Sequence, residues 1–442
     1  MKAPCVITGA LSLMLVGTAA AAEQDGPYPD FGFDPPASYD GPLFQLSQDF
    51  PDKPPEKLPA FFDKLPESFD ADFETWQAYI EAAGEYCLEG NVAANWRVED
   101  NSARDWYHMP WQHYGESARE FIHGLTKEAP IQPRQLAITQ TDPGVTYAVG
   151  IFNAFGGYAL GKVWADPLNP DPSVVSAPNS FPNGTVICKP LFVDIAPAEV
   201  PFLHNPVQWD AYIVDSFSSN DRSVGTVSLI QMDFAVRDER VPETGWLFGT
   251  FQYNGEHNPG GGWDNLVPLG IQWGNDPEVT SSTYTNPTPV RTEINPELEQ
   301  SVINPGDGLP PTHLGWNARM VGPVDNPKAS CMSCHMTAEF PQVSPINPTF
   351  LPPGKAPKEG SKAWMRWFGN LPAGEPFDKG AISTDYSLQL SEALQNYYQW
   401  RCLESGYFAD GDKTGQWLGD KAPQICRDIE RRTHSLLRNQ AQ

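Results

Sequence analysis

The sequence has little positive charge and, after its first residues, no long apolar run. Lys and Arg total 29 against 55 Asp and Glu, which gives a formal net charge of −26. This acidic excess argues against nucleic acid and anionic lipid as partners, and it suits either a basic redox partner or a solvated acidic surface. No segment beyond residue 22 approaches the roughly 18 apolar residues of a membrane helix. We therefore expect no membrane span.

The common nucleotide and hydrolase motifs are also missing. The sequence contains no Gly-x-Ser-x-Gly nucleophile motif, no phosphate-binding loop and no dinucleotide fingerprint. The glycine run "GGGW" at residues 260–263 is typical of a turn. The chemistry of this chain must therefore be sought in other residue types.

The first 22 residues have the features of a secretory signal peptide. Lys2 precedes the apolar run "VITGALSLMLVG", which is too short to span a bilayer, and "TAAAA" supplies small residues for cleavage. We expect this segment to be removed and the mature protein to be exported to the periplasm. Without Lys2, 28 basic residues against 55 acidic ones leave a charge of −27.

One short stretch carries chemistry: "NPKASCMSCHMTAEF", residues 326–340. Cys331 and Cys334 have the spacing that joins both vinyl groups of one haem, and His335 follows directly as an axial ligand. A zinc site would need a second close pair of ligands, and a thioredoxin-like redox pair would need a βαβ setting. We expect one covalent haem c with His335 as the proximal ligand of its iron. An isolated disulfide or another metal remains the alternative.

Cysteine is scarce enough for its pairing to be counted. Cys5 is removed with the signal peptide, and in an oxidising compartment the remaining cysteines should be disulfide-bonded or otherwise covalently engaged. With Cys331 and Cys334 engaged by haem, four cysteines remain. Cys402 and Cys426 form the local pair, and Cys87 and Cys188 form the distant one.

The period of the apolar residues predicts an α+β fold. In "TVSLIQMDFAVRD" the residues alternate between two faces, and similar runs recur from about 140 to 275 without a helical run between them. Such strands pair antiparallel, so we expect a β-sandwich or a barrel-like core. Apolar residues at helical spacing, Phe69, Phe73, Trp76 and Ile80, predict a helix before it.

These patterns divide the mature chain into three parts. Residues 23–135 should form an extended arm and a helical N-terminal part, and residues 136–340 a β-rich haem-binding domain. Residues 341–442 contain a Pro-rich linker followed by helices, one over roughly 384–402 and another from Pro423. The disulfide between Cys402 and Cys426 would staple these two helices together.

The ligand on the other face of the haem is open at this level. Met365 in "AWMRWFGN" has the position of a distal ligand, although packing beside Trp364 and Trp367 explains it equally. The second possibility is a histidine, although each of them is also explained as a structural or surface residue: His108, His113, His123, His204, His257 and His313. The third possibility is an open site lined by aromatic residues. His108 and His113, five residues apart, would also suit a separate metal ion.

The order of two motifs resembles that of the cytochrome c′-beta superfamily, which includes the lysine-cross-linked cytochromes that oxidise hydroxylamine. The strand "SFPNGTVICKPLF" comes first and the haem motif follows late. The resemblance covers at most residues 140–340. It implies a β-rich haem pocket with His335 as proximal ligand and a distal face open to nitric oxide, hydroxylamine or peroxide. It also implies that Lys189 is a possible cross-linking lysine, whereas a plain strand lysine is the alternative.

This chain departs from that family in several respects. It is much longer, with added N-terminal and C-terminal parts, and Cys188 beside Lys189 is available for a disulfide. Three functions follow as expectations. The first is electron transfer by a mono-haem c-type cytochrome. The second is a haem oxidoreductase or gas-binding protein that acts on a small nitrogen oxide or peroxide. The third is a binding scaffold in which haem is structural.

Overall fold

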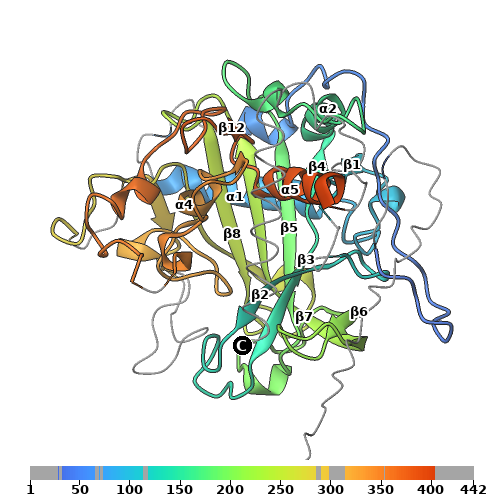
Figure 1. The fold of residues 1–442 in the computed structure, drawn as a ribbon. Coiled ribbons are helices and arrows are strands. Elements are labelled where there is room, and N and C mark those ends of the chain that lie inside the picture. Colours follow the sequence, from blue (N-terminus) through green and yellow to red (C-terminus); the bar gives the residue numbers. More distant parts are fainter. Residues whose placement is uncertain are drawn as a thin grey trace, which may run out of the picture.

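A large antiparallel sheet forms the centre of the protein in the computed structural model (Figure 1). The structure describes Tyr28, Phe69 and residues 32–64, 73–112, 118–284, 290–297, 314–352 and 354–403. The sheet has ten strands in the order β1-β4-β5-β7-β8-β9-β10, with β3 also on β5, β2 on β3, and β6 on β7. Its strands are β1 (Trp106–Tyr107), β2 (Thr126–Ile131), β3 (Gly144–Ala148), β4 (Ile151–Asn153), β5 (Val186–Val193), β6 (Gln208–Val214), β7 (Arg222–Arg237), β8 (Trp246–Tyr253), β9 (Leu266–Gln272) and β10 (Thr292–Ile294).

The helices and a two-stranded sheet surround this centre. The α-helices are α1 (Phe73–Leu88), α2 (Ala154–Val163), α4 (Cys331–His335) and α5 (Leu388–Leu403), and the small sheet pairs β11 (Glu339–Phe340) with β12 (Ile382–Ser383). Short 3₁₀ helices are η1 (Ala60–Lys64), η2 (Val98–Asp100), η4 (Pro172–Val175), η5 (Pro197–Glu199), η6 (Trp263–Asn265), η7 (Trp316–Ala318), η8 (Pro348–Phe350) and η9 (Met365–Phe368). In the part of the chain that the structure describes, no helix is both long and apolar enough to span a membrane.

The predicted α+β class and the antiparallel pairing are confirmed. Every pairing within the ten-stranded sheet is antiparallel. Alternate residues of β7 enter different apolar clusters, with Phe234 in the cluster beside α1 and Ala235 in the cluster that contains Met332 of α4. The sheet also extends into the N-terminal part, because β1 and β2 pair with β4 and β3.

One face of the sheet packs against α1. In Figure 1, α1 (blue) lies behind the sheet and α5 (orange-red) lies in front. Gly84 permits the close approach of α1, since a Cβ there would lie 2.4 Å from the Phe251 ring. The expected disulfide between Cys87 and Cys188 is present and ties α1 to β5. Both cysteines belong to the apolar cluster on this side.

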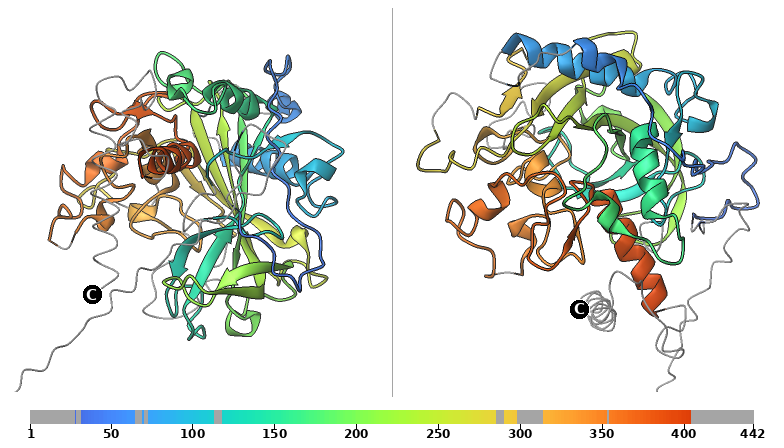
Figure 2. Two further views of the ribbon diagram at one scale, coloured as in Figure 1. Left: turned by 45° about the vertical axis from the view of Figure 1, so that its right-hand side comes forward. Right: turned by 90° about the horizontal axis from the view of Figure 1, so that it is seen from above.

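The other face packs against α2, α4 and α5. Figure 2 shows α2 (green) and α5 (orange-red) on the side of the sheet opposite α1. Phe248 of β8 joins Met332 and Leu390 in a second apolar cluster, which we call the α4-side cluster. Cys402, at the end of α5, is buried and disulfide-bonded. Its expected partner Cys426, and the helix predicted from Pro423, lie outside the described residues.

Candidate haem site

The haem motif folds as the short helix α4, whose start is fixed by a capping box. The Ser333 backbone N–H donates to Ser330 Oγ at 3.0 Å, and the Ser330 backbone N–H donates to Ser333 Oγ at 2.7 Å. These bonds satisfy two otherwise unpaired N–H groups at the first turn. Because residues three and four apart share a helix face, Cys331, Cys334 and His335 lie together on one side of α4.

Asn275 holds both ends of this helix. Its Oδ1 accepts from Ser330 Oγ at 2.7 Å, before the first turn. Its Nδ2 donates to Met336 Sδ at 3.1 Å, after the last turn, and to the Gly369 carbonyl at 2.9 Å. The side chain is fully buried. Asn275 therefore bonds the residues on both sides of α4, and Gln272 of β9 adds a bond from the Met332 backbone N–H at 3.1 Å.

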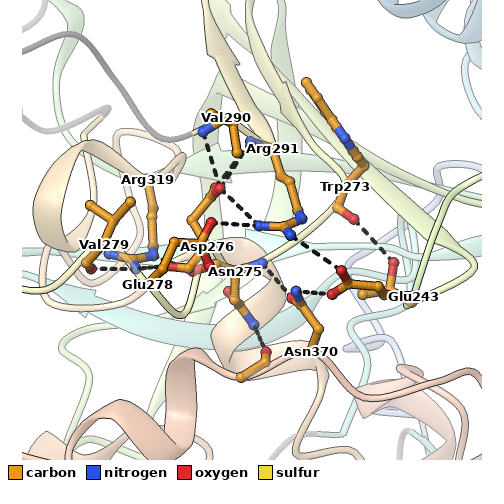
Figure 3. A network of polar contacts seen from close by, with 12 residues as sticks. Glu243, Trp273, Asn275, Asp276, Glu278, Val279, Val290, Arg291, Arg319 and Asn370 are labelled. Atoms are coloured by element: carbon orange, nitrogen blue, oxygen red, sulfur yellow. Dashed lines mark hydrogen bonds and ion pairs between the residues drawn. The ribbon is translucent and has the colours of Figure 1, made fainter. Parts of the chain in front are cut away.

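The loop that carries Asn275 is held in place by a network of hydrogen bonds and ion pairs (Figure 3). The guanidinium of Arg319, fully buried, donates to the carbonyls of Asn275 and Asp276 at 2.6 Å each, and it also bonds two further carbonyls. Its central carbon also lies 5.0 Å from the centroid of the Trp316 ring and 4.8 Å from that of the Phe368 ring. Burial lowers the Arg319 pKa to about 10, so the group stays charged at neutral pH.

Replacing Asn275 by Ala should reduce haem attachment as well as stability. The variant leaves Ser330 Oγ and the Gly369 carbonyl without their buried partner, which costs about 1–3 kcal/mol of unfolding free energy. Asn265→Ala is the matched control, since Asn265 is equally buried and makes three side-chain hydrogen bonds beside β8 and away from α4.

Denaturant unfolding and the ratio of bound haem to protein check this pair of variants. Both should lose similar stability, but only Asn275→Ala should lower the haem ratio. Equal haem ratios in the two variants would show that Asn275 has no special role in placing α4.

His335 is oriented as a metal ligand. Its Nδ1 lies 2.8 Å from the Tyr386 carbonyl oxygen, and because a carbonyl only accepts, Nδ1 must carry the hydrogen. The lone pair is then on Nε2, and a ligating histidine is commonly fixed in this way by a carbonyl on its other nitrogen. Burial lowers the His335 pKa to about 4, although the Tyr386 bond opposes this. The neutral, metal-binding form therefore prevails at neutral pH.

The two thiols meet the requirements of thioether formation. Cys331 and Cys334 are not joined to each other, and both keep accessible surface. Burial raises the pKa of Cys334 to about 12, and burial with the charges of Asp325 and Asp233 raises that of Cys331 well above its usual range. Two unpaired thiols and a free imidazole Nε2 on one helix face fit covalent haem.

A row of polar side chains crosses the sheet beneath α4. Lys189 of β5 lies opposite Asp233 of β7, which lies opposite Thr250 of β8. Directly opposite residues share one face of a sheet, so these three side chains lie on the same face. Thr250 lies two residues after Phe248 in β8 and therefore shares its face, and the Phe248 ring lies 4.6 Å from that of His335. The row therefore belongs to the α4 side. Besides burial, the charge of Lys189 also lowers the pKa of His335, as expected for two groups on the α4 side of the sheet.

Each charged group in this row has a partner. Lys189 Nζ lies 2.8 Å from Glu128 Oε2, with a quarter of each side chain exposed. Asp233 accepts from Thr250 Oγ1 at 2.8 Å. Gln231 Nε2 donates to Asp233 at 2.9 Å and to Asp325 at 3.2 Å, so that one amide bridges two carboxyl groups.

The two bridged carboxyl groups can hold a proton near neutral pH. Burial raises the pKa of Asp233 to about 7, with the charge of Asp325 as the next cause. The pKa of Asp325 is also raised, again mainly by burial. Two close carboxylates resist losing both protons. Lys189 and Asp233 of this row, with Asp325 bridged to Asp233 by Gln231, thus place a cation and a proton-bearing carboxyl pair on the α4 side of the sheet.

The disulfide does not compete with Lys189. Successive residues of a strand point to opposite faces, so Cys188 faces α1 while Lys189 faces α4. The register supports this, since Cys188 lies opposite Phe234, a member of the α1-side cluster, and Lys189 lies opposite Asp233. The departure from the resembled family at Cys188 therefore leaves Lys189 available.

Met365 belongs to a segment that lies beside α4, but its side chain packs against a different apolar cluster from the one that holds the motif. Met365 begins η9 and packs against a separate tryptophan cluster: Trp316, Trp364, Trp367 and Phe368. Met332 and Met336 belong to the α4-side cluster. No described contact joins Met365 to His335, and its role as distal ligand stays a prediction.

The histidines considered as ligands are dispersed. His108 Nδ1 accepts from the Ser47 backbone N–H at 2.9 Å, and the His123 ring stacks on Trp209 at 4.2 Å. His204 and His257 are exposed. His113 and His313 lie outside the described residues, which include no cluster of three or more His, Cys, Asp or Glu placed to hold a metal ion.

Sequence reasoning missed the partners of the motif. Asp233 carried a weak signal, because an acidic residue inside a strongly apolar strand requires a polar neighbour. Tyr386 carried none, since any backbone carbonyl could hold His335. Comparisons with protein-family models, curated proteins and solved structures find no match for this chain. The resemblance to the cytochrome c′-beta superfamily stays a prediction from two sequence motifs.

Proposed function

We propose that this chain is an exported, periplasmic mono-haem c-type protein, with haem held by thioethers to Cys331 and Cys334. Nε2 of His335 is the proximal ligand. The observation that carries this proposal is the bond from His335 Nδ1 to the Tyr386 carbonyl, on a helix that also presents two unpaired thiols. When bound, haem supplies a one-electron redox centre that can also bind small molecules.

Among the expected functions, the geometry favours the haem oxidoreductase with an open distal face. Lys189, Glu128 and Asp233 are half-buried charged or ionisable groups around the motif, and such groups are costly to bury without a role. A carrier needs no ionisable groups beside its iron, whereas a reaction on a small nitrogen oxide or peroxide needs proton donors and acceptors within reach. Electron transfer with a basic partner, supported by the net charge of −26, is the second candidate.

Lys189, Asp233 and Asp325 have separate tasks in this proposal. The Lys189 ammonium orients the negative end of a small nitrogen oxide or peroxide by a hydrogen bond. The Asp233 and Asp325 pair releases or takes up a proton near neutral pH. In the same proposal, a sandwich-like or barrel-like β core forms a pocket around the haem and excludes bulk water from it.

The optical spectrum of protein matured with the c-type haem machinery tests the open site. We expect a high-spin spectrum that shifts when carbon monoxide or nitric oxide is added, because the proposed open distal face leaves the sixth position for a small molecule. Met365→Leu is the control and should leave the spectrum unchanged, since Met365 packs in the tryptophan cluster. A low-spin spectrum that ignores both gases, and that becomes high-spin in Met365→Leu, would establish the carrier instead.

A further inference from the structure

A buried tryptophan is hydrogen-bonded to a buried carboxylate close to His335. Trp246 of β8 and Asp385 are both fully buried. The indole Nε1–H of Trp246 donates to Asp385 Oδ1 at 3.0 Å. A charged acceptor makes this a strong hydrogen bond. The Asp385 carboxylate is therefore placed to accept the indole proton.

Two short routes connect this pair with the proximal histidine. Asp385 directly precedes Tyr386, whose carbonyl oxygen binds His335 Nδ1. The Trp246 ring centroid lies 6.3 Å from that of Phe248 and 6.3 Å from that of Tyr386. The Phe248 ring in turn lies 4.6 Å from the His335 ring. The indole is thus separated from the proximal ligand by one layer of rings.

Asp385 is held as a hydrogen-bond acceptor. Besides the indole, its carboxylate accepts from the backbone N–H of Phe181 at 2.6 Å and of Gly374 at 2.8 Å. Burial raises the Asp385 pKa to about 6, while these bonds and the charge of Arg237 oppose the shift. The group is therefore ionised at neutral pH yet ready to take up one proton.

We propose that Trp246 is a redox-active residue, which gives one electron to the haem centre when a hydroperoxide reacts there, as Asp385 takes the Nε1 proton. The step rests on the proposed haem function. Breaking the O–O bond takes two electrons, one from the haem centre and one from the indole. The proton of the hydroperoxide moves to the departing oxygen, which leaves as an alcohol or as water, and the other oxygen would stay at the haem centre. The proton that Nε1 loses ends on Asp385, which leaves a neutral indolyl radical beside a protonated carboxyl group.

Two other aromatic residues of this region, Trp164 and Tyr386, show no charged proton acceptor among the described residues. Trp164 also belongs to the α4-side cluster and is fully buried, but its Nε1 has no partner among the described residues. The Tyr386 hydroxyl donates to the Leu371 carbonyl at 2.7 Å, which is a neutral acceptor. Burial raises the Tyr386 pKa strongly, so its proton is hard to remove. Trp246 is the residue whose proton can leave together with the electron.

Electron paramagnetic resonance of the full-length, haem-loaded protein tests the proposal, with samples frozen just after mixing with hydrogen peroxide. Wild type and the matched control Trp164→Phe should both give an indolyl radical signal. Trp246→Phe should lose it. Asp385→Asn keeps Trp246 and a hydrogen-bond acceptor but cannot take the proton, so the radical yield should fall by roughly tenfold, given the strength of bonds to charged acceptors.

A radical that persists in Trp246→Phe, or that disappears in Trp164→Phe, would overturn the assignment. Absence of covalent haem would instead count against the proposed function. In that case the same variants are oxidised by a photogenerated one-electron oxidant in protein without haem. A neutral indolyl radical that needs both Trp246 and Asp385 would support the pair, and a cation radical that is insensitive to Asp385→Asn would refute it.

Discussion

Protein in which Cys331 and Cys334 are both replaced by Ser should carry no covalently bound haem. These are the two cysteines that the described part of the structure leaves unpaired, and a hydroxyl does not form the thioether bond to a haem vinyl group. Cys87 and Cys188 form a disulfide on the opposite face of the sheet. No other cysteine among the described residues can therefore replace the pair on α4.

The measurement is the haem that stays with the denatured polypeptide after extraction with acidified acetone, detected by mass and by haem staining on a gel. Wild type should retain it, each single Ser variant should retain part of it through one thioether, and the double variant should retain none. His335→Ala separates attachment from ligation, since it keeps both thiols but loses the Nε2 ligand. Haem retained by the double variant would refute the assignment of Cys331 and Cys334.

Removing the Cys87–Cys188 disulfide should produce the largest loss of stability. The two cysteines are 101 residues apart, and closing a loop of that length restricts the unfolded chain by about 4–5 kcal/mol in the chain-entropy model. A domain is commonly stable by only about 5–15 kcal/mol, so the loss is a large part of the total. Cys87→Ala with Cys188→Ala is the variant, because both side chains are fully buried.

Denaturant unfolding of the matured protein measures this loss, with wild type as the reference. The double Ala variant should also keep its haem wherever it still folds, because Cys188 faces α1 and Lys189 faces α4. An unfolding free energy within about 1 kcal/mol of wild type would mean that the crosslink restricts the unfolded chain little.

Local patterns predicted the elements of this fold well. The alternation of residues along β7 and the helical spacing before Cys87 reflect one buried face in each element, and that information is contained in neighbouring residues. The distant disulfide followed from counting cysteines in an oxidising compartment. The haem motif was visible because its chemistry needs two thiols and an imidazole within five residues.

The sequence by itself therefore determined the α+β class, the antiparallel pairing, the Cys87–Cys188 disulfide and the haem motif. Only the tertiary structure brought Lys189, Asp233 and Asp325 to one side of α4, and only it placed Asp385 beside Trp246. The physical reason is distance along the chain, because strand register and chain reversal decide which residues meet when they are far apart in sequence. A residue's own neighbours in sequence carry no record of that register.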